Sequence, residues 1–338
     1  MNRSEIIALI KFFSLKKTFN FFKLYSSFII SKRTKSSRIY GFPMALSIEP
    51  TTACNLGCPE CPSGLKQFTR KTGNLSTSLN KKIVDELSDN LTYINYYFQG
   101  EPYINPNFFD FVSYANSKKI FCATSTNGHF LNDENCRKTI ESGLKRLIIS
   151  IDGNNQETYE VYRKNGRFDK VIEGTNNMVK WKKQLKSNYP HIIYQFLVVK
   201  TNEHLVDKMK SLASELGVDE LRIKTAQFYN FKNGNKLIPE NDKYSRYIKT
   251  ANGQYKLKNK MSNYCWRMWS SAVITVNGGI VPCCFDKDAK HTLGDVKKNK
   301  FSEIWNSKSY NIFRNQIFSD RSQIDICKNC SEGTKVWA

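Results

Sequence analysis

The sequence has no apolar stretch long enough to cross a bilayer. In the first forty residues a Lys or Arg interrupts every apolar run well short of the roughly 20 residues that a transmembrane helix needs. The same segment lacks the apolar core and small-residue cleavage site of a secretory signal peptide, so we expect a protein of the reducing cytoplasm. Internal repeats and low-complexity tracts are also absent, which argues against a repeat array.

Acidic residues are few relative to basic ones. The 30 Asp and Glu residues stand against 52 Lys and Arg, which gives a formal net charge of +22. A charge of this size attracts anionic partners in general. However, the basic residues are spread along the whole chain and do not gather into a nucleic-acid-binding module with aromatic stacking positions, so no nucleic acid is expected as a partner.

The densest basic region is the N-terminal segment, residues 1–44, whose mixture of basic and apolar residues predicts an amphipathic surface helix. Two interpretations are open. The helix could bind an anionic membrane through buried aromatic rings and Lys charges, or it could pack on the outside of the main domain. The residues concerned are Lys11, Lys16, Lys17, Lys23, Lys32, Arg33, Lys35 and Arg38, interleaved with Phe12, Phe13, Phe19, Phe21, Phe22, Phe28, Ile29 and Ile30.

Residues 45–226 alternate short β-rich runs with helical stretches, among them helices predicted at Leu131–Ser142 and His204–Leu216. This alternation is typical of parallel strands joined by crossover helices. The fold class is therefore α/β, and the six units form either a partial (β/α)6 TIM-type barrel or an open parallel sheet, with the chemistry at the carboxyl ends of the strands. The predicted strands are Ala45–Glu49, Tyr93–Phe98, Ile120–Ser125, Arg146–Ile151, Ile192–Val199 and Glu220–Lys224.

The remainder of the chain divides into a linker and a second, smaller unit. Residues 227–263 are rich in Asn, Lys and Tyr and show little periodicity, which indicates a linker. In residues 264–338, the runs Ala272–Val276 and Ile280–Val281 flank turn residues and predict a β-hairpin. Phe301–Asn315 has the spacing of a short amphipathic helix.

Ten cysteines are present, and most of them lie in tight groups near the two ends. The first group, Cys54, Cys58 and Cys61, follows the first predicted strand in a CxxxCxxC arrangement, and the Gly and Pro residues around it favour a loop. A structural zinc site needs four protein ligands, whereas a [4Fe–4S] cluster held by three cysteines keeps one iron open. A zinc site that takes its fourth ligand from elsewhere is the alternative.

This spacing, on the loop after the first strand, resembles the radical S-adenosylmethionine (SAM) superfamily. The resemblance implies that SAM binds the open iron through its amino and carboxylate groups. It also implies that one electron from the cluster cleaves SAM to a 5′-deoxyadenosyl radical, which removes hydrogen from the substrate. An electron donor such as flavodoxin or ferredoxin is implied in turn. Glu60 stands where the family usually has an aromatic residue near the adenine.

Three further stretches resemble the family's SAM-binding motifs. Gln99-Gly100-Glu101-Pro102 resembles the GGEP motif, whose carboxylate and carbonyl groups accept hydrogen bonds from the SAM ammonium. Asn127 belongs to a Thr-Asn-Gly element, and Ser150 and Arg163 belong to an S-x-D-G stretch and the segment after it. The implied SAM contacts are Gln99, Gly100, Glu101, Asn127, Ser150 and Arg163. Each motif taken alone is also compatible with an ordinary turn or helix cap.

The second cysteine group comprises Cys265, Cys283, Cys284 and the pair Cys327 and Cys330. Four thiolates that include a CxxC pair can bind either a cluster or a zinc ion. The surrounding sequence, such as Asn277–Cys283 and Glu303–Asn306, resembles the SPASM and twitch class of auxiliary-cluster domains. The resemblance implies a second, auxiliary [4Fe–4S] cluster bound by Cys265, Cys283, Cys327 and Cys330, with Cys284 as the alternative to Cys283.

The resemblance implies an enzyme, most simply an oxidoreductase whose auxiliary cluster assists oxidation. Substrates in the resembled class include peptides, protein side chains and small molecules such as aminosugar alcohols. One alternative is a maturase that forms carbon–sulfur or carbon–carbon bonds on a peptide, which would depend on a leader-peptide partner. The other is a zinc-binding nucleic-acid or scaffold protein without enzymatic activity. The remaining cysteines, Cys122 and Cys136, are expected to be small core residues.

Overall fold

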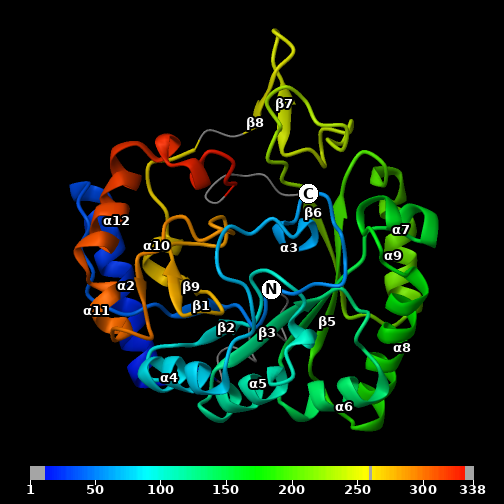
Figure 1. Ribbon diagram of the computed structural model, residues 1–338, viewed down its shortest axis with the longest axis horizontal. Coiled ribbons are helices and arrows are strands. Elements are labelled where there is room, and N and C mark those ends of the chain that lie inside the picture. The colour runs from blue at the N-terminus through cyan, green and yellow to red at the C-terminus, as the bar shows by residue number, and fades with distance from the viewer. Residues whose placement is uncertain (1–11, 259–260, 332–338) are drawn as a thin grey trace.

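The computed structural model describes residues 12–258 and 261–331 (Figure 1). Its centre is a run of six parallel strands that follow one another in chain order. They are β1 (Ala45–Ile48), β2 (Tyr93–Asn95), β3 (Phe121–Thr126), β4 (Arg146–Ser150), β5 (His191–Val198) and β6 (Glu220–Thr225). The predicted α/β fold with six βα units is confirmed, and each strand begins within one residue of its predicted start.

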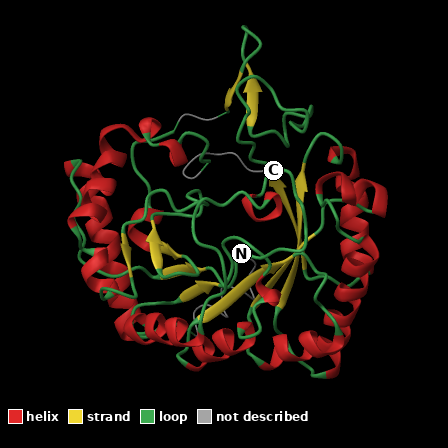
Figure 2. Ribbon diagram, viewed as in Figure 1, coloured by secondary structure: helices red, strands yellow, loops and turns green. Residues whose placement is uncertain are grey.

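Helices cover the outer side of the curved sheet, and loops fill its inner side (Figure 2). The helices of this outer layer are α4 (Thr77–Leu87), α5 (Phe108–Ser117), α6 (Asp133–Glu141), α7 (Gln156–Tyr162), α8 (Phe168–Gln184) and α9 (Val206–Glu215). Apolar residues on the outward face of the strands pack against these helices, because successive side chains of a strand point to opposite faces.

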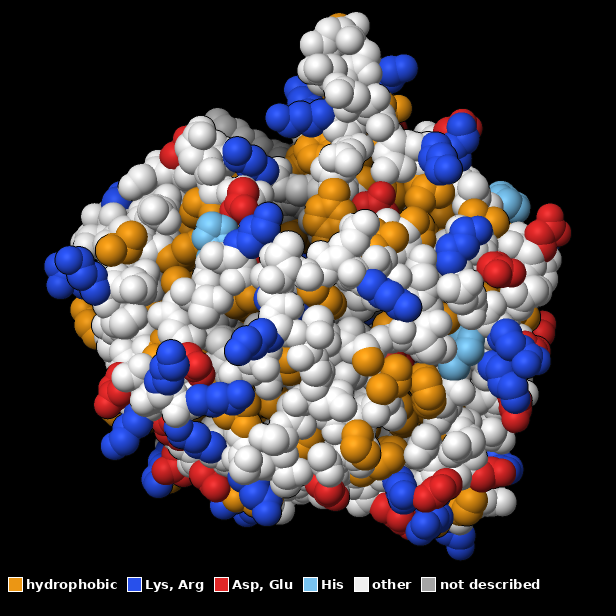
Figure 3. All heavy atoms as spheres, in the orientation of Figure 1, with side chains coloured by type: hydrophobic (Ala, Val, Ile, Leu, Met, Phe, Trp, Pro, Cys, Tyr) orange, Lys and Arg blue, Asp and Glu red, His pale blue; other side chains and the backbone are white. Residues whose placement is uncertain are grey.

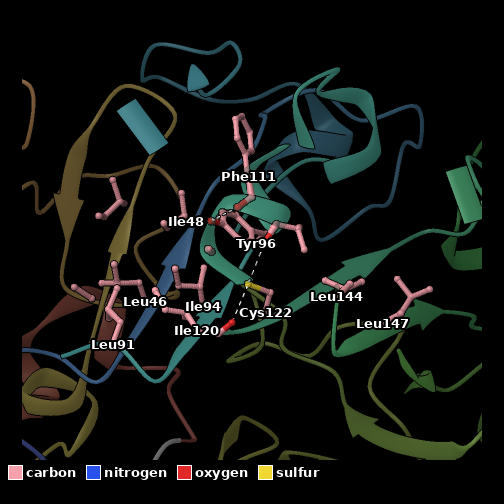
Figure 4. Close-up of a cluster of buried hydrophobic side chains, with 14 of the residues drawn as sticks. Leu46, Ile48, Leu91, Ile94, Tyr96, Phe111, Ile120, Cys122, Leu144 and Leu147 are labelled. Atoms are coloured by element: carbon pink, nitrogen blue, oxygen red, sulfur yellow. Dashed lines mark hydrogen bonds between the residues drawn. The ribbon is translucent and has the colours of Figure 1, made fainter. Parts of the chain in front are cut away.

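The core between sheet and helices is apolar with a few hydrogen-bonded groups (Figure 4). Ile94 and Tyr96 are completely buried there. The Tyr96 hydroxyl lies 3.0 Å from Asn80 Oδ1 and 3.1 Å from the carbonyl oxygen of Phe111, which satisfies a polar group that burial would otherwise destabilise. Cys122 in β3 and Cys136 in α6 are fully buried, as expected of core residues.

The C-terminal unit continues the same sheet. Strand β9 (Ser271–Ile274) lies parallel to β1, with Ala45 opposite Ser271. The predicted hairpin is confirmed, because β10 (Gly279–Val281) pairs antiparallel with β9, and β11 (Gly294–Asp295) pairs antiparallel with β10. The strand order is therefore β11-β10-β9-β1-β2-β3-β4-β5-β6.

Two elements differ from the sequence prediction. The segment 227–263 contains an antiparallel hairpin, β7 (Tyr247–Lys249) and β8 (Tyr255–Leu257), which projects from the molecule at the top of Figure 1. The single helix expected at Phe301–Asn315 is two helices, α11 (Phe301–Trp305) and α12 (Lys308–Asp320). The chain breaks there because Ser307 caps α12, with its Oγ accepting a hydrogen bond from the Tyr310 amide at 3.2 Å.

The predicted N-terminal helix is α2 (Leu15–Thr34), while Lys11 lies outside the described residues. The Asn20 side chain holds the helix to Phe42 through two hydrogen bonds of 2.8 Å. Phe28 packs edge-on against Trp266 and Trp269 of the C-terminal unit. No helix within the described residues is both long enough and apolar enough to cross a membrane.

Candidate functional site

The carboxyl ends of the parallel strands meet at one edge of the sheet, and the first cysteine group lies there. Cys54, Cys58 and Cys61 occupy the loop between β1 and the short helix α3 (Pro62–Leu65). The amide of Gly57 donates to the Lys164 carbonyl at 2.8 Å, and the Cys61 amide donates to the Cys58 carbonyl at 3.2 Å. The loop therefore curves back on itself and is held against the segment that follows α7.

Two of the three thiols, those of Cys54 and Cys58, lie in a desolvated environment. All ten cysteines belong to the described residues and are free of disulfides. Burial raises the pKa of Cys54 to about 12, and burial also raises the pKa of Cys58, although the Arg163 guanidinium opposes the shift. Because buried thiols resist ionisation, a bound cation is needed to stabilise the thiolates at neutral pH.

This donor set fits an iron–sulfur cluster. Iron–sulfur clusters prefer cysteine thiolates as ligands, and this donor set consists of three cysteines without an oxygen or nitrogen ligand. Within the described ranges, no group of three or more His, Cys, Asp or Glu side chains is arranged to hold a metal ion. A cluster of four irons does not require such an arrangement, because its protein ligands bind separate iron atoms.

Gly100 brings the loop after β2 against the cysteine loop. Its φ is +73°, and a Cβ atom added there would lie 2.2 Å from the Thr51 carbonyl oxygen. The Gly100 amide donates to Ser63 Oγ at 2.8 Å, and Gln99 Oε1 lies 3.9 Å from Cys61 Sγ. A residue with a side chain could not occupy position 100 without displacing one of the two loops.

Glu101 is a buried carboxylate at the centre of the site. It accepts hydrogen bonds from Thr126 Oγ1 and the Asn127 amide, both at 2.7 Å, and its own amide donates to the Ala53 carbonyl at 2.8 Å. Burial raises the pKa of Glu101 to about 7, and these hydrogen bonds oppose the shift. A cation next to this carboxylate would favour its ionised form.

The ends of β3 and β4 supply two more of the predicted residues. Asn127 Nδ2 donates to Asn55 Oδ1 at 2.7 Å and lies 4.0 Å from Cys54 Sγ, so this side chain touches the cysteine loop directly. Ser150 is the last residue of β4 and is buried at the same edge of the sheet.

Arg163 lies beside the first cysteine group because a buried aspartate holds it there. Its Nε donates to Asp152 Oδ2 at 2.5 Å, and its Nη1 lies 3.9 Å from Cys58 Sγ. Asp152 is completely buried, and its Oδ1 accepts a hydrogen bond from the Leu197 amide at 2.7 Å. Asp152 was not among the predicted site residues. The sequence offered one signal for Asp152, because this residue belongs to the same S-x-D-G stretch as Ser150.

Glu60 also has a role that the sequence did not indicate. Its Oε2 accepts a hydrogen bond from the Tyr229 amide at 3.2 Å, and its Oε1 accepts one from Asn235 Nδ2 at 3.1 Å. The residue thus holds the chain that leaves β6 against the cysteine loop. In the sequence, position 60 stood out only because Glu60 replaces the aromatic residue that the resembled family usually has there.

The second cysteine group gathers around a buried arginine. Cys265, Cys327 and Cys330 are all less than 10% exposed, and Arg321 Nη2 lies 3.2 Å from Cys330 Sγ. Cys283 interacts electrostatically with Cys265 and Cys327, and burial raises its pKa. The charge of the neighbouring Cys284 acts on Cys283 and also on Tyr97, which follows β2.

A cleft of about 1090 Å³ opens between the two cysteine groups. The residues that line it include Pro62 and Leu65 of α3, Tyr229 and Phe231 after β6, and Ile326 and Asn329 beside the second group. Figure 3 shows hydrophobic side chains below the projecting hairpin, with Lys and Arg side chains scattered over this face. The cleft is large enough for a small molecule and also for a short peptide segment.

We expect Gly100→Ala to destabilise the protein and to reduce its iron content, because the added Cβ collides with the Thr51 carbonyl. Gly73→Ala is the matched control, since Gly73 also has a positive φ but has no atom within 4 Å of the added Cβ. Urea unfolding and iron analysis after anaerobic reconstitution measure both effects. Equal losses in the two variants would contradict the close approach of the two loops.

Two family models match the chain. The Radical SAM superfamily matches residues 48–220, and an iron–sulfur cluster-binding domain, SPASM, matches residues 265–331. The mycofactocin maturase MftC of Mycobacterium tuberculosis is 29% identical over 175 residues, which are 52% of this chain and 43% of that protein. The matched region therefore spans less than half of that relative's length.

Two further comparisons cover more of the chain. The S-adenosyl-L-methionine-dependent 2-deoxy-scyllo-inosamine dehydrogenase of Niallia circulans is 21% identical over 291 residues, covering 85% of this chain and 92% of that protein. The crystal structure of Streptococcus suis SuiB bound to its precursor peptide SuiA has a TM-score of 0.63 at 14% identity, covering 91% of this chain and 75% of that one. At this identity the structural similarity bears on the fold alone.

Proposed function

The chain belongs to the radical SAM superfamily, and from this premise we propose that it cleaves SAM reductively and removes hydrogen from a small-molecule or peptide substrate. One observation carries the proposal. Three free thiols, two of them desolvated, lie at the carboxyl edge of the parallel sheet beside the buried Glu101 and the Asp152–Arg163 pair. When bound, the cluster and SAM would supply the electron and the 5′-deoxyadenosyl radical.

We assign Cys54, Cys58 and Cys61 as the ligands of the catalytic [4Fe–4S] cluster. Cys265, Cys283, Cys327 and Cys330 would bind the auxiliary cluster. The electrostatic interaction of Cys283 with Cys265 and Cys327 supports its membership of this set, and Cys284 is the alternative ligand. We also propose that residues 45–226 form the barrel unit and that residues 264–338 form the auxiliary-cluster unit.

The chain's own residues would bind and orient SAM. The ionised Glu101 would accept hydrogen bonds from the SAM ammonium, with Gln99 and Gly100 beside it. Asn127 and Ser150 would contact the cofactor from the ends of β3 and β4. Arg163 would present its guanidinium to the SAM ribose or carboxylate, because Asp152 fixes it next to Cys58.

The relatives are compatible with either class of substrate. They include a dehydrogenase of 2-deoxy-scyllo-inosamine and a protein whose structure was solved with its precursor peptide. The cleft between the two cysteine groups accommodates both classes by size. The electron is expected to come from a donor such as flavodoxin or ferredoxin.

We expect Cys58→Ala to abolish formation of 5′-deoxyadenosine from SAM and a strong reductant, because the catalytic cluster loses a ligand. Cys327→Ala should spare SAM cleavage and lose substrate oxidation, because only the auxiliary cluster is affected. Cys122→Ala, at a fully buried cysteine outside both groups, is the control and should retain both activities. Chromatography of SAM products after anaerobic purification makes the measurement.

Equal loss of SAM cleavage in the Cys58 and Cys327 variants would contradict the division of roles. Metal analysis of the wild-type protein tests independently whether the protein binds iron–sulfur clusters. A colourless protein with zinc in place of iron and sulfide would support the scaffold alternative, and an iron-loaded protein that yields no 5′-deoxyadenosine would contradict the proposed reaction.

SAM affinity should rise several-fold between about pH 6 and about pH 7.5, because burial raises the pKa of Glu101 to about 7 and only the ionised carboxylate pairs fully with an ammonium. Glu101→Gln should bind SAM about tenfold or more weakly near pH 7.5 and should lose this pH dependence. Anaerobic equilibrium dialysis measures both effects. Glu157→Gln, at an exposed position on α7, is the control, and parallel pH profiles in wild type and Glu101→Gln would refute the assignment.

We further propose that α2 contacts an anionic membrane. Its inner face is packed on the protein, yet Leu15, Phe19 and Phe22 on its outer face are 90%, 62% and 59% exposed. Lys23 lies over the Phe19 ring, 4.6 Å from its centre, and residues 6–48 contain no acidic residue. An exposed apolar stripe with basic residues and no acidic ones complements an anionic lipid surface.

The double variant Phe19→Ser and Phe22→Ser should lose binding to phosphatidylcholine vesicles that contain about one third phosphatidylglycerol. Co-sedimentation measures this binding, and vesicles of pure phosphatidylcholine should bind the wild type less. Ile312→Ser is the control, because Ile312 is an exposed apolar residue on α12. Equal sedimentation of the wild type and the double variant would exclude the α2 surface as the contact.

A further inference from the structure

One histidine joins the loop after β3 to the segment between α7 and α8. His129 is half-buried, and its ring lies beside that of Tyr159, with the two ring centroids 6.5 Å apart. The Arg167 amide donates to His129 Nε2 at 2.8 Å. The other ring nitrogen, Nδ1, lies 3.0 Å from Asn127 Oδ1 and 3.2 Å from the Asn127 carbonyl oxygen. Each ring nitrogen of His129 therefore contacts a different segment of the chain.

These contacts determine the tautomer of the His129 ring. A backbone amide can only donate, so His129 Nε2 accepts a hydrogen bond from Arg167 and carries no proton. A neutral ring then has its proton on Nδ1, where both neighbouring atoms are oxygens of Asn127. Burial lowers the pKa of His129, which favours this neutral form.

His129 in turn fixes the orientation of the Asn127 side chain. The backbone amide of His129 donates to Asn127 Oδ1 at 3.1 Å, and the protonated Nδ1 lies 3.0 Å from the same oxygen. Two donors require an acceptor, so the amide oxygen of Asn127 faces His129 and its NH2 group is directed elsewhere. Asn127 is only 5% exposed, so the opposite orientation would leave buried donors facing one another without an acceptor.

The NH2 group of Asn127 faces the first cysteine group. Nδ2 donates to Asn55 Oδ1 at 2.7 Å, which uses one of its two hydrogens, and Cys54 Sγ lies 4.0 Å from the same nitrogen. Hydrogen bonds to the sulfur atoms are among the factors that set the reduction potential of an iron–sulfur cluster. A donor directed at a cysteine ligand stabilises the reduced, more negative state and so raises the potential.

We propose that His129 is a positioning residue for the first cluster: it holds the Asn127 NH2 group toward Cys54 and thereby raises the reduction potential of the cluster bound there. The inference rests on the proposed function, which assigns Cys54 as a cluster ligand. His129 exchanges no proton or electron in the reaction, and its effect passes through Asn127. A higher potential allows a weaker electron donor to reduce the cluster.

The test is a potentiometric titration of the reconstituted holoenzyme under anaerobic conditions, followed by electron paramagnetic resonance. The first cluster is the one whose signal changes when SAM is added, because that cluster has the open iron. We expect its midpoint potential to be more negative in His129→Phe, which keeps a ring beside Tyr159 but has neither donor nor acceptor. His129→Asn, whose side-chain NH2 group can replace the Nδ1 donor, should restore the potential toward that of the wild type.

A double variant tests whether the effect passes through Asn127. Asn127→Ala should also lower the potential, and adding His129→Phe to it should cause no further shift, because the two residues act as one unit. His204→Phe is the matched control, since His204 is exposed in the short helical turn Glu203–Leu205, and it should leave the potential unchanged. Iron and sulfide analysis shows that each variant retains its clusters, and His129→Ala replaces His129→Phe if the latter does not.

Equal midpoint potentials in the wild type and in His129→Phe overturn the inference. A further shift in the double variant, or a potential in His129→Asn as negative as in His129→Phe, overturns it as well. SAM cleavage, measured on the same samples, separates this inference from the proposed function. A wild-type protein without a SAM-sensitive cluster signal overturns both, whereas SAM cleavage together with an unshifted potential in His129→Phe overturns this inference alone.

Discussion

The hydrogen bonding of β9 to β1 is the interaction on which the relation between the two cysteine groups depends. The two strands pair over four residues, from Ala45 with Ser271 to Ile48 with Ile274. β1 leads directly into the first cysteine loop, and β9 begins six residues after Cys265. One continuous sheet therefore fixes the distance and orientation of the two groups, as a flexible tether would not.

A buried ion pair extends this connection beyond the strands. Glu49, the residue after β1, is completely buried and binds Arg70 through both of its oxygens, at 2.6 and 2.8 Å. The Glu49 carboxylate also accepts a hydrogen bond from the Val276 amide, in the turn after β9, at 3.1 Å. Because a carboxylate without partners is costly to bury, the three segments are held to one arrangement.

The sequence predicted the features that rest on local pattern and missed those that rest on distant contacts. The short β-rich runs between helical stretches located all six parallel strands, and the Cys54–Cys61 spacing located the first group, because both signals lie within short windows. The pairing of Glu60 with Asn235 joins residues 175 positions apart, so no local pattern could reveal that contact, whereas Asp152 and Arg163 are 11 positions apart and the motif shared with Ser150 was a signal for Asp152. The break between α11 and α12 was local, but a single Ser at position 307 is a weak signal inside an otherwise helical pattern.

The departure at Glu60 has a structural consequence for the cleft. An aromatic residue at this position could offer a ring but no charged acceptor, whereas the Glu60 carboxylate accepts hydrogen bonds from the Tyr229 amide and the Asn235 side chain. Tyr229 lines the cleft between the two cysteine groups, and Glu60 directly precedes the cysteine at the end of the first loop. The wall of the cleft is therefore attached to the loop that carries the first three thiols.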